Sequence, residues 1–322
     1  MRRRDFLLLA SAGATVWKPA VKRIGAPRLG FIDAGSRQES QKLLDAFRDA
    51  LAALGWIDGN NIRILDRWAE GQVEWLPGIV RGLIGSGVDV LVTVGTPATL
   101  AAKRATRTIP IVLVGVDDPA AVGVVDSRAP DGGNVTGLSL SSSELIEKRL
   151  RLLRELVRPH RLAVIIREDP GIDDRLLVIR GHAERMGMEL LALQADSGKA
   201  LERSFERLRG ERCDAVYVAS GPLGPAKRAR IIALAIESRV PAIYPLRIFA
   251  VDGGLMSFGA EYDDLFRRAA GFVDKIIGGA DPGQLPIERP TKFDFVINVQ
   301  TAQALDLTMP PGLLAAADAL IE

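Results

Sequence analysis

The chain has 322 residues, of which 48% are hydrophobic and 25% charged, proportions that are typical of globular proteins. This composition excludes a disordered or low-complexity chain, and the length is sufficient for two domains with substantial cores. The formal net charge is +2, but residues 1–14 hold three basic and one acidic residue, which leaves 39 of each sign in the rest. A neutral body without a basic stripe lacks an electrostatic footprint for DNA or RNA, so we expect no nucleic-acid partner.

Residues suited to metal or covalent chemistry are few in this sequence. The single cysteine, Cys213, can form neither an internal disulfide nor a cysteine cluster, and the two histidines, His160 and His182, leave little for an imidazole site. The sequence also lacks the motifs of phosphate loops, dinucleotide-binding turns, nucleophile elbows and zinc proteases. We therefore expect no metal, no cofactor and no catalytic residue.

The N-terminus has the pattern of an export signal. A basic start precedes a short apolar run that ends in small residues, and Arg3-Arg4-Asp5-Phe6-Leu7 resembles a twin-arginine signal. The apolar run is shorter than the roughly 20 residues of a membrane span, and no cysteine follows it to carry a lipid anchor. We expect a protein free in the periplasm, cleaved after Ala14 or near Ala20 or Ala26. The alternative is an amphipathic N-terminal helix or arm.

From residue 28 onward, short apolar runs alternate with longer amphipathic segments, which is typical of βαβ units with a parallel sheet. In the first half we expect strands at 28–33, 61–67, 88–94, 110–116 and 134–140, and helices at 37–54, 73–84 and 97–106. A helix at 142–156 leads to a second set, with strands at 162–166, 189–194, 215–219 and 242–244 and helices at 174–186, 200–209 and 226–238. The chain then continues with a strand at 254–258, a helix at 263–277 and a strand at 293–298.

These patterns predict an α/β protein of two Rossmann-like lobes with parallel sheets, joined by a hinge. The last elements are too few for a third domain, so we expect them to return and complete the two sheets. The expected organisation is an export signal and linker at 1–26, an N-terminal lobe at 27–141 plus about 254–280, and a C-terminal lobe with the hinge at 142–250 plus about 290–322.

Candidate ligand-binding residues follow the strands, because open parallel sheets bind ligands beyond the carboxyl ends of their strands. Thr96 and Pro97 are expected to cap a helix whose free N–H groups face an anion, or simply to start a helix that binds nothing. Asp118 either accepts from a ligand or forms an Asx turn, and Tyr244 is either a cleft wall or a core aromatic. Further candidates on the same argument are Gly35, Ser36, Arg167, Ser220 and Arg247.

Several motifs together resemble one known family. They include Gly55-Trp-Ile-Asp-Gly-Asn-Asn-Ile62, Gly95-Thr-Pro-Ala98, Gly132-Gly-Asn-Val-Thr-Gly-Leu-Ser139, Gly253-Gly-Leu-Met-Ser257 and Pro290-Thr-Lys-Phe-Asp-Phe-Val-Ile-Asn298. In their order and spacing they resemble the ABC-transporter substrate-binding proteins that include tryptophan- and tyrosine-binding members.

The resemblance implies a type I periplasmic-binding fold, with two lobes joined by three crossovers that close on a small ligand. It implies a carboxylate site at Thr96-Pro97 and Ser139, with the Asp118 region also facing the cleft. The chain departs from the family where Ser220-Gly221 replaces the acidic or Asn pair that holds a ligand ammonium. Arg167 and Arg247, if they point inward, would suit a second anionic or carbonyl group; otherwise they face solvent.

The function expected from these observations is solute binding for an ABC importer. A small polar or aromatic ligand, such as an amino acid or another carboxylate-bearing compound, would be captured between the lobes and passed to a permease in the inner membrane. The protein itself would perform no chemistry. The alternatives are a ligand-sensing or regulatory module with the same two-lobe fold, and an enzyme built on that fold.

The paired arginines allow a test of export. We expect that changing both Arg3 and Arg4 to Lys leaves the protein in the cytoplasm, because the twin-arginine route requires the pair. Fractionation of cells that express either form measures this. Undiminished export of the double variant would indicate the general secretory route instead.

Overall fold

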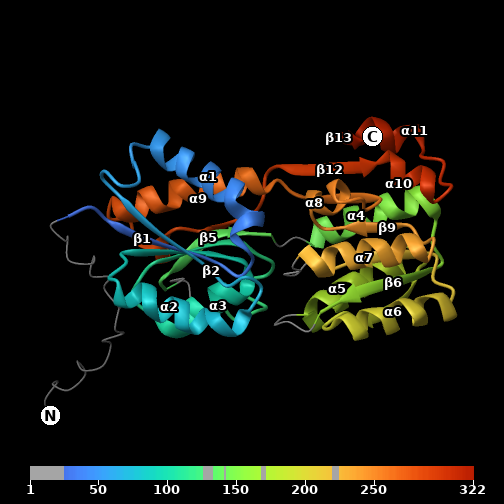
Figure 1. Ribbon diagram of the computed structural model, residues 1–322, viewed down its shortest axis with the longest axis horizontal. Coiled ribbons are helices and arrows are strands. Elements are labelled where there is room, and N and C mark those ends of the chain that lie inside the picture. The colour runs from blue at the N-terminus through green and yellow to red at the C-terminus, as the bar shows by residue number, and fades with distance from the viewer. Residues whose placement is uncertain (1–24, 126–132, 141–142, 168–171, 220–224) are drawn as a thin grey trace, which may run out of the picture.

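The computed structural model describes residues 25–125, 133–140, 143–167, 172–219 and 225–322, so most of the expected export signal and Ser220 lie outside the described residues. The chain forms two α/β lobes that lie side by side (Figure 1). Each lobe has one sheet with hydrophobic clusters on both faces. The expected fold class is therefore confirmed.

The first lobe has a sheet in the order β11-β5-β4-β3-β1-β2, and all its strands are parallel. Its strands are β1 (Arg28–Asp33), β2 (Arg63–Trp68), β3 (Val90–Val94), β4 (Ile111–Val116), β5 (Val135–Ser139) and β11 (Ile287–Glu288). Its helices are α1 (Arg37–Ala53), α2 (Leu76–Gly85), α3 (Gly95–Ala105) and α9 (Tyr262–Ile277), with 3-10 turns η1 (Val73–Trp75) and η2 (Pro282–Gln284).

The second lobe has a sheet in the order β13-β12-β10-β9-β8-β6-β7, in which β12 runs antiparallel to β10. Its strands are β6 (Arg161–Ile166), β7 (Glu189–Gln194), β8 (Ala215–Val218), β9 (Ala242–Tyr244), β10 (Met256–Ala260), β12 (Phe293–Asn298) and β13 (Ala319–Ile321). Its helices are α4 (Ser143–Val157), α5 (Ile172–Arg185), α6 (Gly198–Gly210), α7 (Pro225–Glu237), α8 (Arg247–Val251), α10 (Val299–Ala304) and α11 (Pro311–Ala316).

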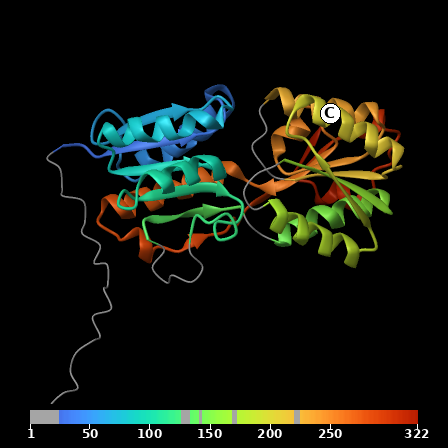
Figure 2. The same cartoon turned by 90° about the horizontal axis from the view of Figure 1, so that it is seen from below.

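The returning segment divides between the lobes differently from our expectation. We expect about 254–280 in the first lobe, but β10 pairs with β9 and β12 in the second sheet, and the return to the first lobe begins with α9 and continues through η2 to β11. The physical reason is that β10 is buried along most of its length, so it needs a paired neighbour on each side. The chain passes between the lobes after β5, at Glu261 and after β11 (Figure 2).

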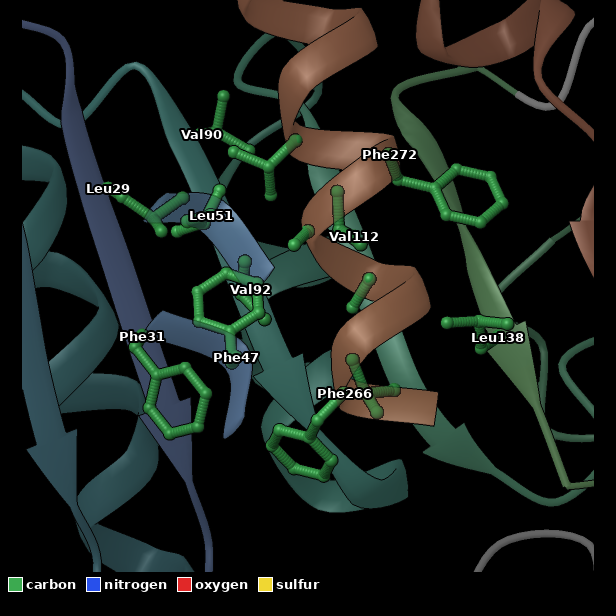
Figure 3. Packing of buried hydrophobic residues seen from close by; sticks show 14 of the residues in the cluster. Leu29, Phe31, Phe47, Leu51, Val90, Val92, Val112, Leu138, Phe266 and Phe272 are labelled. Atoms are coloured by element: carbon green, nitrogen blue, oxygen red, sulfur yellow. The ribbon is translucent and has the colours of Figure 1, made fainter. Parts of the chain in front are cut away.

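Aromatic side chains from three separate segments fix α1 and α9 on the first sheet. Phe31 of β1 lies 6.1 Å from Phe47 of α1 and 6.2 Å from Phe266 of α9, measured between ring centroids, and all three are fully buried (Figure 3). Their burial removes large apolar areas from water, which stabilises the packing of a late segment against the first two elements.

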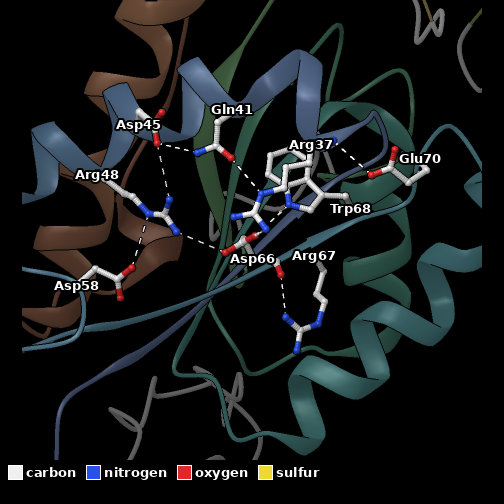
Figure 4. Close-up of polar contacts among 9 residues, drawn as sticks. All are labelled: Arg37, Gln41, Asp45, Arg48, Asp58, Asp66, Arg67, Trp68 and Glu70. Atoms are coloured by element: carbon white, nitrogen blue, oxygen red, sulfur yellow. Dashed lines mark hydrogen bonds and ion pairs between the residues drawn. The ribbon is translucent and has the colours of Figure 1, made fainter.

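An ion-pair network covers β2, the edge strand of the first sheet. Arg48 of α1 lies within 3.7 Å of carboxylate oxygens of Asp45, Asp58 and Asp66, and Asp66 also accepts from the indole N–H of Trp68 (Figure 4). Charged side chains at an edge strand discourage pairing with another chain. The network also holds the N-terminal half of the lobe in one arrangement, because it joins α1 to β2.

The close approach of β4 and β5 requires a glycine at position 137. Gly137 has φ +129°, and a Cβ there would overlap the carbonyl oxygen of Leu113. We expect Gly137→Ala to lower the free energy of unfolding by about 2–4 kcal/mol, because the overlap is with backbone that cannot move aside. Urea unfolding measures the change.

Gly271→Ala is the control for this substitution. Gly271 lies inside α9 with nothing within 4 Å of an added Cβ, so alanine there should stabilise by up to about 1 kcal/mol. Equal effects of the two substitutions would contradict a close approach at Gly137.

Candidate functional site

The two sheets direct the carboxyl ends of their parallel strands toward each other. Two ion pairs between the lobes show this arrangement. Glu39, in the first turn of the helix after β1, lies 2.7 Å from Arg228 near the start of α7, which follows β8. Asp117, directly after β4, lies 3.0 Å from Arg175 in the first turn of α5, which follows β6. Open parallel sheets bind their ligands at these ends.

Arg228 joins three segments of the chain at this interface. Besides Glu39, its guanidinium contacts Asp252 at the end of α8, with an Nε to Oδ2 distance of 2.6 Å. The side chain is only 11% exposed. Burial lowers the pKa of Arg228, but the two carboxylates more than offset it and raise the pKa overall. The arginine therefore stays charged where the lobes meet.

Asp33 is an acidic side chain buried at the last position of β1. It is 5% exposed, and its Oδ1 accepts a hydrogen bond of 2.7 Å from the Gly35 N–H. Its Oδ2 is also buried and has no hydrogen-bond partner among the residues that the structure describes. Burial raises the pKa of Asp33 to about 6, aided by the charges of Glu39 and Glu70 and opposed by the Gly35 N–H and the nearby Ser40 hydroxyl.

Tyr262 brings α9 into the same region. Its hydroxyl would lie 3.5 Å from a Cβ on Gly115 of β4, where the glycine has φ +74°. Burial raises the pKa of Tyr262, and so do the charges of Asp117 and Asp33, whereas Arg149 of the second lobe lowers it. The hydroxyl therefore lies within electrostatic range of both strand-end carboxylates and of the facing lobe.

Arg149 is a buried cation on α4 near the crossovers. It is 5% exposed, and its guanidinium donates to the Phe258 carbonyl at 2.6 Å and to the Tyr217 hydroxyl at 3.1 Å. These contacts tie α4 to β10 and β8. The polar groups brought together between the lobes thus come from α1, β1, β4, α9, α4, α5 and α7 (Figure 1).

Thr96 does not have the capping role that we expected. The helix begins at Gly95, which has φ +77°, and its N-cap is Val94 without a side-chain hydrogen bond. Thr96 and Pro97 therefore lie inside the first turn. The expectation of an N-cap is wrong because the glycine allows the helix to start directly from β3, two residues earlier than a threonine cap at position 96 would place it.

Several other predicted residues have structural roles in this arrangement. Ser36 caps α1 by accepting from the Glu39 N–H. Asp118 accepts from the Ala120 and Ala121 N–H groups at 3.1 and 3.0 Å, which is the Asx-type turn left open above. Ser139 is buried, and its hydroxyl donates to the Glu288 carbonyl at 3.3 Å. Ligand binding by these residues stays a prediction.

In the second lobe, burial decides between the alternatives for Tyr244, whereas ligand binding by Arg247 and Arg167 stays a prediction. Tyr244 is 1% exposed and stacks on Phe249 at 4.8 Å inside a hydrophobic cluster, so it is a core aromatic and not a cleft wall. Arg247 is half exposed and pairs with Asp294 at 2.9 Å, within its own lobe. The positive charge of Arg167 lowers the pKa of Lys227, although burial is the larger cause of that lowering.

Sequence reasoning missed Asp33, Tyr262, Arg149, Arg175 and Arg228. A signal existed for Asp33, because an acidic residue ended a strand that was otherwise apolar. The three arginines lie on charged helices, where a sequence gives no sign of which charges face another lobe. In the described residues, no group of three or more His, Cys, Asp or Glu side chains could hold a metal ion. None of the described helices is long and apolar enough to cross a bilayer.

Comparison with known proteins supports a common architecture. A family model described as ABC transporter substrate binding protein matches residues 31–321. The tyrosine-binding protein of Clostridioides difficile is 26% identical over 288 residues, which cover 89% of this chain and 81% of that protein.

Solved structures agree with this match. A conserved domain protein from Vibrio cholerae has a TM-score of 0.84 at 24% identity and covers 92% of this chain and 99% of its own. A domain from Streptococcus pneumonia, solved in complex with L-Trp, has a TM-score of 0.83 at 21% identity, and the match covers 92% of this chain and 100% of that domain. These likenesses confirm the expected type I periplasmic-binding fold.

The buried Asp33 carboxylate leads to a prediction for stability. The folded protein binds the Asp33 proton more tightly than the unfolded chain does, so the stability of the wild type falls as pH rises from about 4 to above 6. The Asp33→Asn variant has no carboxyl group to ionise at this position, so its stability should not fall in this way. Its side-chain amide oxygen can still accept from the Gly35 N–H. We expect the variant to be more stable at pH 7.5 by about 2–3 kcal/mol, and the gain to vanish near pH 4.

Urea unfolding of both proteins at pH 4 and pH 7.5 measures this difference. Asp45→Asn, which neutralises an exposed carboxylate of the same lobe, is the control and should change little at either pH. A variant at position 33 that is less stable than the wild type at pH 7.5 would contradict an unpartnered buried carboxylate.

Proposed function

Since the chain belongs to the ABC transporter substrate binding protein family, we propose that it captures a small ligand between its two lobes and delivers it to the permease of an ABC importer. The observation that carries this proposal is the pair of interlobe ion pairs, Glu39 to Arg228 and Asp117 to Arg175. They join the ligand-binding edges of the two sheets face to face. A ligand between these edges would contact both lobes at once and so favour their closed arrangement.

The ligand that we propose is an aromatic amino acid. Two relatives support this class, because one is named for tyrosine binding and another was solved with L-Trp. The lobes face each other with opposite charges, since the interlobe ion pairs take their carboxylates from the first lobe and their guanidinium groups from the second, and a zwitterion between the lobes would meet a field of matching polarity. The role is binding without chemistry, in keeping with a family of substrate-binding proteins.

We further propose that the protein is exported and acts in the periplasm. The support is the N-terminal sequence, with paired arginines before a short apolar run. Delivery to a membrane permease requires the protein to reach that side of the inner membrane.

Binding and closure can be measured together. We expect calorimetric titration to detect binding of L-tryptophan or L-tyrosine, and small-angle scattering to show a smaller radius of gyration with the bound amino acid, because closure brings the lobes together. Arg228→Ala should weaken this binding about fivefold, since the closed state loses an interlobe contact worth about 1 kcal/mol.

Arg230→Ala is the matched control on the same helix. Arg230 pairs with Glu202 and Glu237, both of its own lobe, so its loss should leave affinity unchanged. No binding of either amino acid would overturn the proposed ligand class. An unchanged scattering profile at saturating amino acid would overturn closure.

A further inference from the structure

We propose that Asp33 is a ligand-binding residue that accepts hydrogen bonds from a cationic amine of the ligand, so that the ligand's ammonium group lies against the first lobe. This inference rests on the proposed function, because it takes the ligand to lie between the lobes. It adds the residue that recognises the charged amine.

The hydrogen bonding of Asp33 is incomplete in a way that requires an outside donor. Oδ1 accepts from the Gly35 N–H, whereas Oδ2 is buried and accepts no hydrogen bond from any described residue. A buried carboxylate oxygen without a donor is costly, and the large majority of such atoms in folded proteins have a partner. Folding alone does not account for this carboxylate, since an apolar side chain would end β1 at lower cost.

The position of Asp33 puts this oxygen where a ligand is expected. Asp33 is the last residue of β1, and α1, the next helix, holds Glu39 in its first turn. Because Glu39 pairs with Arg228 of the second lobe, the end of β1 lies at the edge of the sheet that faces the second lobe. Tyr262, within electrostatic range of Asp33, is in turn influenced by Arg149 of the second lobe. Asp33 therefore belongs to the interlobe region and not to the outer surface of the first lobe.

The charges around Asp33 select for a cation. Glu39 on α1 and Glu70 after β2 are the charged groups that act on it, and both are acidic. The hydroxyl groups of Ser40 on α1 and Tyr262 on α9 also interact with Asp33. Glu39 is already paired with Arg228, so the negative charges without such a partner are those of Asp33 and Glu70. A ligand carboxylate would be repelled at this position, whereas an ammonium group would donate to Oδ2 and offset that negative charge.

The test compares an amino acid with its deaminated analogue on two proteins. The probes are L-tryptophan and indole-3-propionate, with L-tyrosine and 3-(4-hydroxyphenyl)propionate as a second pair, titrated calorimetrically at pH 7.5. We expect the wild type to bind each amino acid at least about a hundredfold more tightly than its analogue. Asp33→Asn should lose about thirtyfold or more for the amino acids and change less than threefold for the analogues.

The pH profile gives a second readout that a merely structural role would not produce. As pH falls from 7.5 to 5.0, Asp33 gains a proton and the wild type should lose about tenfold in affinity for the amino acids. The Asn variant should show no such loss. Asp45→Asn, which removes an exposed charge paired with Arg48 on the same helix, should behave as the wild type throughout.

The outcomes separate this inference from the proposed function. If the wild type binds neither amino acid, the proposed ligand class fails and the role of Asp33 fails with it. If the wild type binds an amino acid but Asp33→Asn binds it equally well, only the role of Asp33 fails. An equal loss for amino acid and analogue also overturns it, because recognition would then not depend on the amine.

Discussion

All strands of a parallel sheet end at the same edge, and this constraint decides where each lobe can hold polar groups. Along β1, β4 and β8 the side chains are apolar and buried, so the chain can place a charge only where the strand ends. Asp33 and Asp117 occupy such positions in the first lobe. Because the chain crosses between the lobes three times, the two edges face each other, and groups far apart in sequence meet there.

The two edges differ in the sign of their charge. Asp33, Glu39 and Asp117 make the first edge acidic, whereas Arg175 and Arg228 make the second edge basic. Opposite signs attract across the interface, but Asp33 is not used for that attraction and keeps a buried oxygen without a donor among the described residues. A buried carboxylate that costs stability and leaves one oxygen without a partner is typical of a binding site, where function and stability compete.

Sequence patterns predicted the helices and strands better than the contacts between elements that are far apart in the sequence. The strands 28–33 and 189–194 have the expected bounds, because in each an apolar run lies between polar residues, although β1 is buried and β7, at a sheet edge, is mostly half-buried. A similar apolar run in β10 indicates a buried strand but does not indicate which sheet the strand joins, so the prediction that β10 belongs to the first lobe was wrong. The helix at Gly95 begins early because a positive φ, which the sequence does not display, replaces the cap. The sequence could not distinguish Arg175 and Arg228 from arginines exposed to solvent. Helix periodicity shows which residues face the core of their own lobe, but not which charged residues face the other lobe.

The interlobe ion pairs are too weak to hold the lobes closed by themselves. Their side chains are 11–25% exposed, and partly exposed pairs contribute about 1 kcal/mol each, because desolvation and lost side-chain freedom oppose the attraction. Moving a two-state equilibrium from mostly open to mostly closed takes about 5.5 kcal/mol of preference for one state. The ion pairs therefore reduce the free energy that ligand binding must supply for closure, but they do not replace the ligand. A ligand donor at the Asp33 oxygen would anchor the ligand on the first lobe in both states, and the contacts that the anchored ligand then makes with the second lobe would supply the preference for closure.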